Sequence, residues 1–299
     1  MKIGYPCMNL TIDCKGSRTF RLENYSEERM IEIIENNLDC LIEMLKFNVK
    51  SNLLFFRVTS DLVPFASHPI CTFNWQKHFQ EKFQKIGKFI QKNNIRISMH
   101  PDQFIVLNSK DKEVVRRSIA ELKYHAEVLD LMKLDKTAKI QLHLGGGYGD
   151  KNRSLERFIK NYEKLDGSVK NRLVIENDDK IYSFKDCLFV SNEIEVPILF
   201  DVFHHSILNN GEEIPDLLER QSKTWKKQDG IPMVDYSSQK TDFRTGSHAE
   251  TIDLKDFEGF LNSSKPYDFD IMLEIKDKES SALKSLRILE KDNRFVKGG

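Results

Sequence analysis

Histidine and carboxylate side chains recur where short apolar segments of this 299-residue chain end. They are His100, His143, Glu176, Asp201, His204, Asp235 and Glu274, and His248 follows in a loop. A carboxylate inside a segment such as LVIE or IMLE is costly to bury without a partner. Several such charges converging on one place would also repel one another, and a divalent cation removes both costs. The pattern therefore predicts a metal centre; the alternative is a polar plug in which the same side chains hydrogen-bond to one another.

The ligand types restrict the metal. Mixed imidazole and carboxylate ligands suit Mn²⁺, Zn²⁺ or Fe²⁺ better than Ca²⁺, and the set contains no cysteine for a structural zinc site. Because eight ligands are too many for one ion, we expect two or three divalent ions, bridged by Glu176. We expect Mn²⁺, with Mg²⁺, Zn²⁺ and Co²⁺ as alternatives. Ions about 3.5–4 Å apart are the usual device for hydrolysing phosphate esters: one makes hydroxide and another stabilises the leaving oxygen.

The segments that carry these residues read as strands. There are eight of them, at residues 2–9, 52–61, 95–100, 139–145, 172–178, 197–205, 231–239 and 270–276. Amphipathic segments separate them, and strand followed by helix, repeated eight times, is typical of an α/β fold, the (β/α)₈ TIM barrel. In such barrels the chemistry lies at the carboxyl ends of the strands, which is where the predicted ligands stand.

Helical periodicity supports the same fold. Helices are expected over residues 26–51, 74–94, 112–134, 154–165, 183–193, 213–225, 254–263 and 278–295. Two loops, 60–74 and 236–253, are long enough to contact a substrate. No linker divides the chain, so we predict one domain over 1–299, with 277–299 as a C-terminal helix and a frayed tail.

Composition restricts the class of protein further. The 46 basic and 46 acidic residues balance, which neither supports nor excludes a nucleic-acid partner. No apolar run approaches the roughly 20 residues of a membrane span, and the chain starts directly in a strand, so we expect neither a membrane segment nor a signal peptide. Five scattered cysteines without a CxxC pair predict no disulfide framework and a reduced, cytoplasmic protein.

At the level of motifs the chain resembles the UV damage endonuclease family, ATP-independent DNA repair enzymes related in fold to endonuclease IV. The motifs are IGYPCMNLT, SDLVPFASHP, MHPDQFIVLN, LHLGGGYGDK, VIENDD, FDVFHH, VDYSSQ, GSHAETID and IMLEIKDKE, and the likeness covers about residues 1–276. It implies an enzyme that cuts DNA on the 5′ side of pyrimidine photoproducts, both cyclobutane dimers and 6-4 photoproducts, and at abasic sites. The partner it implies is double-stranded DNA carrying UV lesions, bound by a monomer at the nucleoid.

The resemblance also implies roles for particular residues. His100, His143 and Glu176 resemble the ligands of one metal, Glu176, Asp201 and Glu274 those of a second, and His204 and His248 those of a third, more open position. Glu176, Glu274 and His68 resemble catalytic or active-site residues. Tyr5 and Asn9 resemble residues near the damaged nucleotides. Gln103 and Phe104 resemble a pair that wedges into the duplex, although the family usually has tyrosine in place of Phe104.

One strand departs from the family pattern. Lys-x-His is expected on the seventh strand, whereas this chain has Met233 and Asp235. We predict that Asp235 binds metal directly, because it would otherwise be an unpaired carboxylate in an apolar setting. Met233 points to the same barrel face and is expected to pack as an uncharged neighbour.

The wedge has a physical rationale of its own. A photodimer weakens stacking, so its extrusion requires less free energy than extrusion of normal bases. Gln103 could then hydrogen-bond to the bases that have lost their pairing partners, while Phe104 stacks on them. The alternative is that Phe104 packs under its loop with Ile105 and Leu107.

Basic residues beside these motifs are less specific. Lys151, after the glycine-rich LGGGYGD, and Arg244, near His248, could contact DNA phosphates or be solvated surface charges. Two other functions remain open at this stage: a metal-dependent sugar isomerase or epimerase on the same barrel, and a non-catalytic protein that binds metal or damaged DNA.

Overall fold

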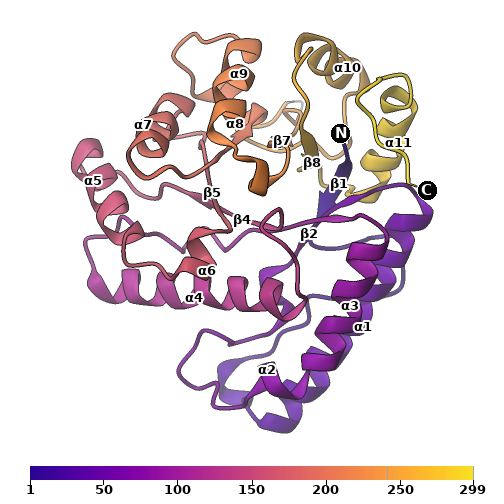
Figure 1. Cartoon of the computed structure of the whole chain (residues 1–299), viewed down its shortest axis with the longest axis vertical. Helices are drawn as coiled ribbons and strands as arrows, with labels where there is room; N and C mark the ends of the chain where they lie inside the picture. The colour runs from indigo at the N-terminus through magenta and orange to yellow at the C-terminus, as the bar shows by residue number, and fades with distance from the viewer. Residues whose placement is uncertain (241, 299) are drawn as a thin grey trace.

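Eight short parallel strands close into a barrel in the computed structural model, which describes residues 1–240 and 242–298 (Figure 1). The strands are β1 (Ile3–Pro6), β2 (Phe55–Val58), β3 (Arg96–Met99), β4 (Lys139–His143), β5 (Leu173–Glu176), β6 (Ile198–Asp201), β7 (Met233–Tyr236) and β8 (Asp270–Leu273). Each pairs with the next in sequence, and β8 pairs with β1. The predicted TIM barrel is confirmed. Thr241, in the loop 236–253, and Gly299, at the end of the predicted tail, lie outside the described residues.

Helices surround the strands on the outside of the barrel (Figure 1). They are α1 (Glu27–Lys50), α2 (Trp75–His78), α3 (Gln80–Lys92), α4 (Lys112–Leu131), α5 (Lys151–Tyr162), α6 (Gly167–Lys170), α7 (Phe184–Ile194), α8 (Val202–Ile207), α9 (Ile214–Thr224), α10 (Leu254–Ser263) and α11 (Glu279–Leu289). Three 3₁₀ turns, Leu22–Asn24, Ser60–Leu62 and Lys227–Asp229, complete the elements. The predicted helix 74–94 is divided at Phe79, which ends α2 and precedes α3.

The two-residue period of the strands sorts the barrel interior into layers. An apolar layer fills the middle of the barrel and consists of Phe55, Val174, Leu199, Trp225, Met233 and Met272. Met233 is fully buried there, so the expectation of an uncharged packed neighbour is confirmed. Two residues further along their strands, and therefore on the same face, stand Arg57, Asp235 and Glu274. The apolar layer therefore lies directly below the polar residues at the mouth of the barrel.

The sixth strand is shorter than the sequence predicted. A strand over 197–205 was expected, but β6 ends at Asp201 and α8 begins at Val202. The reason is local, because the Asp201 carboxylate accepts a hydrogen bond from the backbone N–H of His204 at 2.7 Å and so caps the helix. His204 therefore reaches the barrel mouth from the first turn of a helix.

Two predictions about the chain's covalent and terminal structure are wrong. Cys14 and Cys40 form a disulfide with their Cα atoms 5.5 Å apart, because the β1–α1 loop folds back over α1. Their separation of 26 residues matches no motif that a sequence could reveal. The C-terminal tail is also tied down, since the N–H of Val296 donates to the Met1 carbonyl at 2.9 Å.

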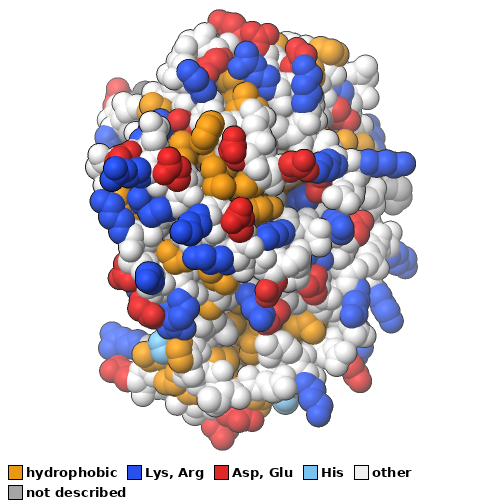
Figure 2. All heavy atoms as spheres, turned by 60° about the vertical axis from the view of Figure 1, so that its left-hand side comes forward, with side chains coloured by type: hydrophobic (Ala, Val, Ile, Leu, Met, Phe, Trp, Pro, Cys, Tyr) orange, Lys and Arg blue, Asp and Glu red, His pale blue; other side chains and the backbone are white. Residues whose placement is uncertain are grey.

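The surface agrees with the balanced composition. Figure 2 shows acidic and basic side chains intermixed over the side of the molecule that carries α5 and α7. Within the part of the chain that the structure describes, no helix is long and apolar enough to cross a membrane.

Two helical glycines provide a test of the packing between helices. A Cβ atom added to Gly87 in α3 would lie 1.8 Å from the Met132 carbonyl oxygen at the end of α4, whereas one added to Gly259 in α10 would meet nothing within 4 Å. We expect Gly87→Ala to lower the free energy of unfolding by about 3 kcal/mol, because α3 must move away from α4. Gly259→Ala should raise it by up to about 1 kcal/mol. Urea denaturation measures both, and equal midpoints for the two variants would contradict the close approach of α3.

Candidate metal centre and nucleic-acid cleft

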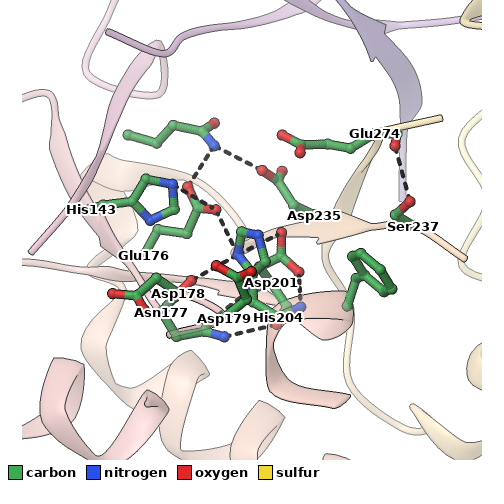
Figure 3. A network of polar contacts seen from close by, with 12 residues as sticks. His143, Glu176, Asn177, Asp178, Asp179, Asp201, His204, Asp235, Ser237 and Glu274 are labelled. Carbon is green, nitrogen blue, oxygen red and sulfur yellow. Dashed lines mark hydrogen bonds and ion pairs between the residues drawn. The ribbon is translucent and has the colours of Figure 1, made fainter. Parts of the chain in front are cut away.

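Glu176, at the end of β5, is the hub of the barrel mouth. Its carboxylate is 1% exposed and three imidazoles surround it. Its Oε2 lies 3.5 Å from His100 Nε2, and its Oε1 lies 3.7 Å from His143 Nε2 and 3.5 Å from His204 Nδ1. Figure 3 shows the His143 and His204 rings on either side of it. One carboxylate reached by three nitrogens can bridge ions, as the sequence predicted for Glu176.

Asp201 joins this hub from β6. Its Oδ1 caps α8, while its Oδ2 lies 3.2 Å from His204 Nδ1. The Asn177 side chain holds the Asp201 backbone, donating to its carbonyl at 2.9 Å and accepting from its N–H at 3.0 Å. Burial raises the pKa of Asp201 to about 7, although His204 opposes this. Burial lowers the pKa of His204, but the carboxylates of Asp201 and Glu176 together outweigh this effect and raise the pKa to about 11.

Asp235 and Glu274 form the other side of the mouth, and both contact Arg57. Asp235 Oδ2 accepts from Arg57 Nη2 at 2.6 Å and from Gln141 Nε2 at 2.8 Å, and the other guanidinium nitrogen donates to Glu274. The Gln141 amide also donates to Glu176 at 2.9 Å and so links the two sides. Figure 3 shows Asp235 between Glu176 and Glu274.

Three overlapping groups of ligand atoms could hold metal. They are His100 with His143 and Glu176; Glu176 with Asp201 and His204; and Asp201 with Asp235 and Glu274. Within each group one ligand atom per residue lies within 4.8 Å of the others. The predicted ligands are thus brought together, with His248 at their edge, where its Nε2 lies 3.9 Å from Glu274 Oε2.

Two of the histidines, His100 and His248, are oriented as metal ligands usually are. His100 Nδ1 lies 2.6 Å from the Pro101 carbonyl, and His248 Nδ1 lies 2.8 Å from the Glu274 carbonyl. A carbonyl at Nδ1 fixes the proton there and leaves Nε2 free to bind a cation. These donors fit a divalent metal of the Mn²⁺ or Zn²⁺ type.

The charge of the mouth also favours cations. Burial alone would raise the pKa of Glu176, but the surrounding imidazoles outweigh it and hold the pKa well below its usual value. Burial raises the pKa of Asp235 well above its ordinary value, against the opposing effect of Arg57. Burial also acts on Glu274, but there Arg57 prevails and the pKa is about 2. Glu176 and Glu274 therefore stay ionised although they are buried, which favours a cation beside them.

The reason for predicting Asp235 as a metal ligand is wrong. Asp235 was expected to lack a partner without a metal, yet Arg57 and Gln141 both pair with its Oδ2. Its Oδ1 is buried without a hydrogen bond from any described residue. Direct metal binding by Asp235 stays a prediction, and it would have to use Oδ1.

Arg57 and Gln141 are the functional candidates that the sequence reasoning missed. Each lies inside an apolar strand, in FFRV and in KIQLH, at a position that the two-residue period turns inward. That period was the available signal, because a buried arginine needs an anionic partner.

The predicted wedge residues lie beside this centre. Gln103 and Phe104 are on the β3–α4 loop, and Phe104 is 74% exposed. The alternative in which Phe104 packs under its loop is therefore wrong. A cleft of about 960 Å³ connects both residues with His143, His204 and His248. A larger cavity of about 1240 Å³, lined by α8, α10 and the loop between β7 and α10, contains none of the predicted ligands.

The remaining predicted site residues lie further from the metal groups. His68 is exposed, its Nδ1 accepts from the Ile70 N–H at 3.1 Å, and it belongs to none of the three groups. Tyr5 is fully buried and donates to Asn48 Oδ1 at 2.7 Å, and Asn9 donates to the Tyr5 hydroxyl at 2.8 Å. Contact of these three residues with DNA stays a prediction.

The two basic residues singled out are both exposed. Lys151 begins α5, and its Nζ lies 2.7 Å from Asp186 Oδ2. Arg244 lies in the β7–α10 loop, which also brings Gly246 and His248 to the cleft. Their contact with phosphates stays a prediction.

The chain is similar to known proteins over almost its whole length. The family model described as UV-endonuclease UvdE matches residues 1–297. The UV DNA damage endonuclease of Clostridium perfringens is 40% identical over 99% of this chain and 72% of its own length. The crystal structure titled SacUVDE is 47% identical, with a TM-score of 0.94 over 99% of this chain and all of that one.

A more distant neighbour shows the fold alone. Endonuclease IV from Thermus thermophilus is 15% identical, with a TM-score of 0.57 over 84% of this chain and 95% of that one. The residue-level resemblance thus agrees with a family match that spans the barrel and every ligand at its mouth. The chain belongs to the UV-endonuclease UvdE family, a family of DNA hydrolases.

Proposed function

We propose that this chain is a DNA repair endonuclease that cuts the strand on the 5′ side of UV photoproducts by metal-assisted phosphodiester hydrolysis. Cyclobutane dimers are the main substrate, with 6-4 photoproducts and abasic sites as further ones. The observation that carries the proposal is one cleft that joins the histidines of the metal groups to the exposed wedge residues Gln103 and Phe104. It acts as a monomer on double-stranded DNA inside the cell.

The metal groups support hydrolysis. Two or three divalent ions, Mn²⁺ in the first place, would supply a hydroxide and stabilise the leaving oxygen. Glu176 would bridge ions, while Asp201 keeps one oxygen for metal because its other oxygen caps α8. The backbone carbonyls at His100 and His248 keep their Nε2 atoms directed at the mouth. Glu274, held by Arg57, keeps Oε2 beside His248.

The rim of the cleft supports recognition of displaced bases. Phe104 and Tyr148 line the cleft, are exposed by 74% and 38%, and lie on loops that follow strands. Exposed aromatic rings can stack on bases, at about 1–3 kcal/mol per base. Arg117 and Lys180 line the same cleft and could neutralise phosphates.

The open cleft argues against the sugar isomerase or epimerase. Such an enzyme needs a small closed pocket that excludes water from its substrate, whereas here an aromatic side chain at the mouth is three-quarters exposed. A non-catalytic binding protein would have no need for three overlapping groups of hydrolytic ligand atoms.

A nicking assay tests the proposal. The purified protein with Mn²⁺ is incubated with supercoiled plasmid, either UV-irradiated or not, and the products are separated on agarose gels. We expect nicks only in the irradiated plasmid, with 5′ ends mapping next to adjacent pyrimidines. Tight binding without nicks would support the binding protein instead, and sugar turnover without either would support the epimerase.

The wedge gives a specific prediction. Phe104→Ala should reduce the preference for a dimer-containing duplex over undamaged duplex by about tenfold, because the ring stacks only where bases are displaced. Affinity for undamaged duplex should change by less than about twofold, since phosphate contacts are common to both. Fluorescence anisotropy with both duplexes measures the ratio.

A matched variant controls for the loss of an exposed phenylalanine. Phe189, 49% exposed, lies on α7 away from the cleft, and Phe189→Ala should leave the ratio unchanged. If Phe104→Ala shifted both binding curves equally, Phe104 would have no part in selecting the lesion.

A further inference from the structure

Arg57 lies between two carboxylates of the barrel mouth. Its side chain is 4% exposed, and its two terminal nitrogens reach two different carboxylates, those of Asp235 and Glu274. Those same carboxylates, with Asp201, make up the third group of candidate ligands. Of the three groups, this one alone has an arginine between its members and contains no histidine.

The charges of the barrel mouth are balanced better by two divalent ions than by three. Imidazoles that bind metal are neutral, so in the metal-bound state the four carboxylates and one guanidinium of the mouth carry a net charge of −3, the ions themselves not counted. Two divalent ions bring it to +1, which the phosphate of a bound DNA strand can balance, whereas three would bring it to +3. A dication in the third group would also stand next to the fixed guanidinium, where the low dielectric of the interior strengthens their repulsion.

We propose that this centre holds two divalent ions and that Arg57 closes the third group as a built-in cation. One ion would lie among His100, His143 and Glu176, and the other would lie among Glu176, Asp201 and His204. This rests on the proposed function only in treating these groups as metal sites. In this arrangement Asp235 is the partner of Arg57 and holds the guanidinium in place, instead of binding metal as the sequence predicted.

Arg57 also orients Glu274, a carboxylate of the third group. It binds one oxygen of Glu274 and leaves Oε2 free on the side of His248. Gln141 completes the arrangement, since its amide joins Asp235 to the bridging Glu176. A carboxylate fixed at one oxygen presents the other in a single direction, which a metal site requires.

Counting bound metal tests the proposal without any DNA. The protein is loaded with excess MnCl₂, desalted and analysed by inductively coupled plasma mass spectrometry, and a manganese titration followed by calorimetry provides a second count. We expect about two ions per chain for the wild type. Asp235→Asn should keep both, with less than about a threefold change in manganese affinity, because the amide oxygen of the new side chain can still accept from Arg57.

Removing the Arg57 guanidinium should instead change the number of bound ions. Arg57→Met should raise the count by about one ion, since three carboxylates then lack a cation. Should that variant fail to fold, the double variant Arg57→Met/Asp235→Leu removes both members of the buried pair, an exchange that proteins often tolerate. It should bind about two ions.

A matched pair elsewhere in the barrel controls for the loss of a buried salt bridge. Arg96 and Asp270 form one at the opposite end, 2.9 Å long and buried on both sides. Asp270→Asn should reduce stability without changing the metal count. Three ions in the wild type would overturn the proposal, as would loss of an ion in Asp235→Asn or in the double variant, or an unchanged count in folded Arg57→Met. A wild type with two ions and no nicking would leave this inference standing and overturn the proposed function alone.

Discussion

Glu176→Gln is expected to lower the rate of nicking of UV-irradiated DNA by about a thousandfold or more. Glu176 is the one residue shared by the two groups that contain histidine, and its two oxygens face three imidazoles. An amide at this position has one oxygen and no charge, so it cannot bridge two cations. Single-turnover nicking of a duplex with one defined dimer measures the loss.

Binding should separate this effect from misfolding. Affinity for the same duplex should stay within about threefold, because phosphate and stacking contacts lie outside the hub. The control is Asp229→Asn, another buried carboxylate, which pairs with Lys139 Nζ at 2.5 Å at the far end of the barrel. It should keep full nicking activity. Wild-type rates for Glu176→Gln at saturating Mn²⁺ would remove Glu176 from the catalytic centre.

Removal of metal should abolish nicking and also lower the melting temperature. Without cations the four carboxylates of the mouth face one another with Arg57 as their fixed positive charge. A ligand present at about a thousand times its Kd stabilises the folded state by about 4 kcal/mol, which corresponds to roughly 6 °C for a chain of this length. Scanning fluorimetry before chelation, after it and after readdition of Mn²⁺ measures the shift.

Readdition of Mn²⁺ tests whether the loss of metal causes both changes. Mn²⁺ should restore both the melting temperature and nicking, and Glu176→Gln should recover only part of the thermal shift. An unchanged melting temperature after complete chelation, verified by metal analysis, would mean that the mouth is stable without cations and would contradict the charge argument.

The barrel and the clustering of most candidate ligands could be predicted because they depend on local pattern. A strand end followed by a helix places His100, His143 and Glu176 on one rim whatever the packing around them. The exact start of α8 could not be predicted, since the Asp201 side chain that ends the strand is itself a candidate ligand. Helix capping and metal binding compete for the same residue type.

The partners of buried charges could not be predicted because they join distant strands. Arg57 meets Asp235 across 178 residues of sequence, and no spacing rule connects them. The Cys14–Cys40 disulfide depends likewise on the path of an irregular loop. The Tyr5 hydroxyl was assigned to DNA by resemblance, and its burial against Asn48 became visible only with α1 packed on the barrel.

The order of the ligands along the chain has a consequence for biosynthesis. The first group of metal ligands is complete once β5 has left the ribosome and the second once α8 has followed, whereas Glu274 arrives only after β8. Closure of the barrel requires β8 to pair with β1, so the last carboxylate of the mouth is added as the barrel closes. Such long-range pairing is slow, because the loop entropy must be overcome before the contact forms. A nascent chain truncated before β8 would therefore possess metal ligands but no closed barrel to hold them in place, and we expect nuclease activity only after β8 has been made.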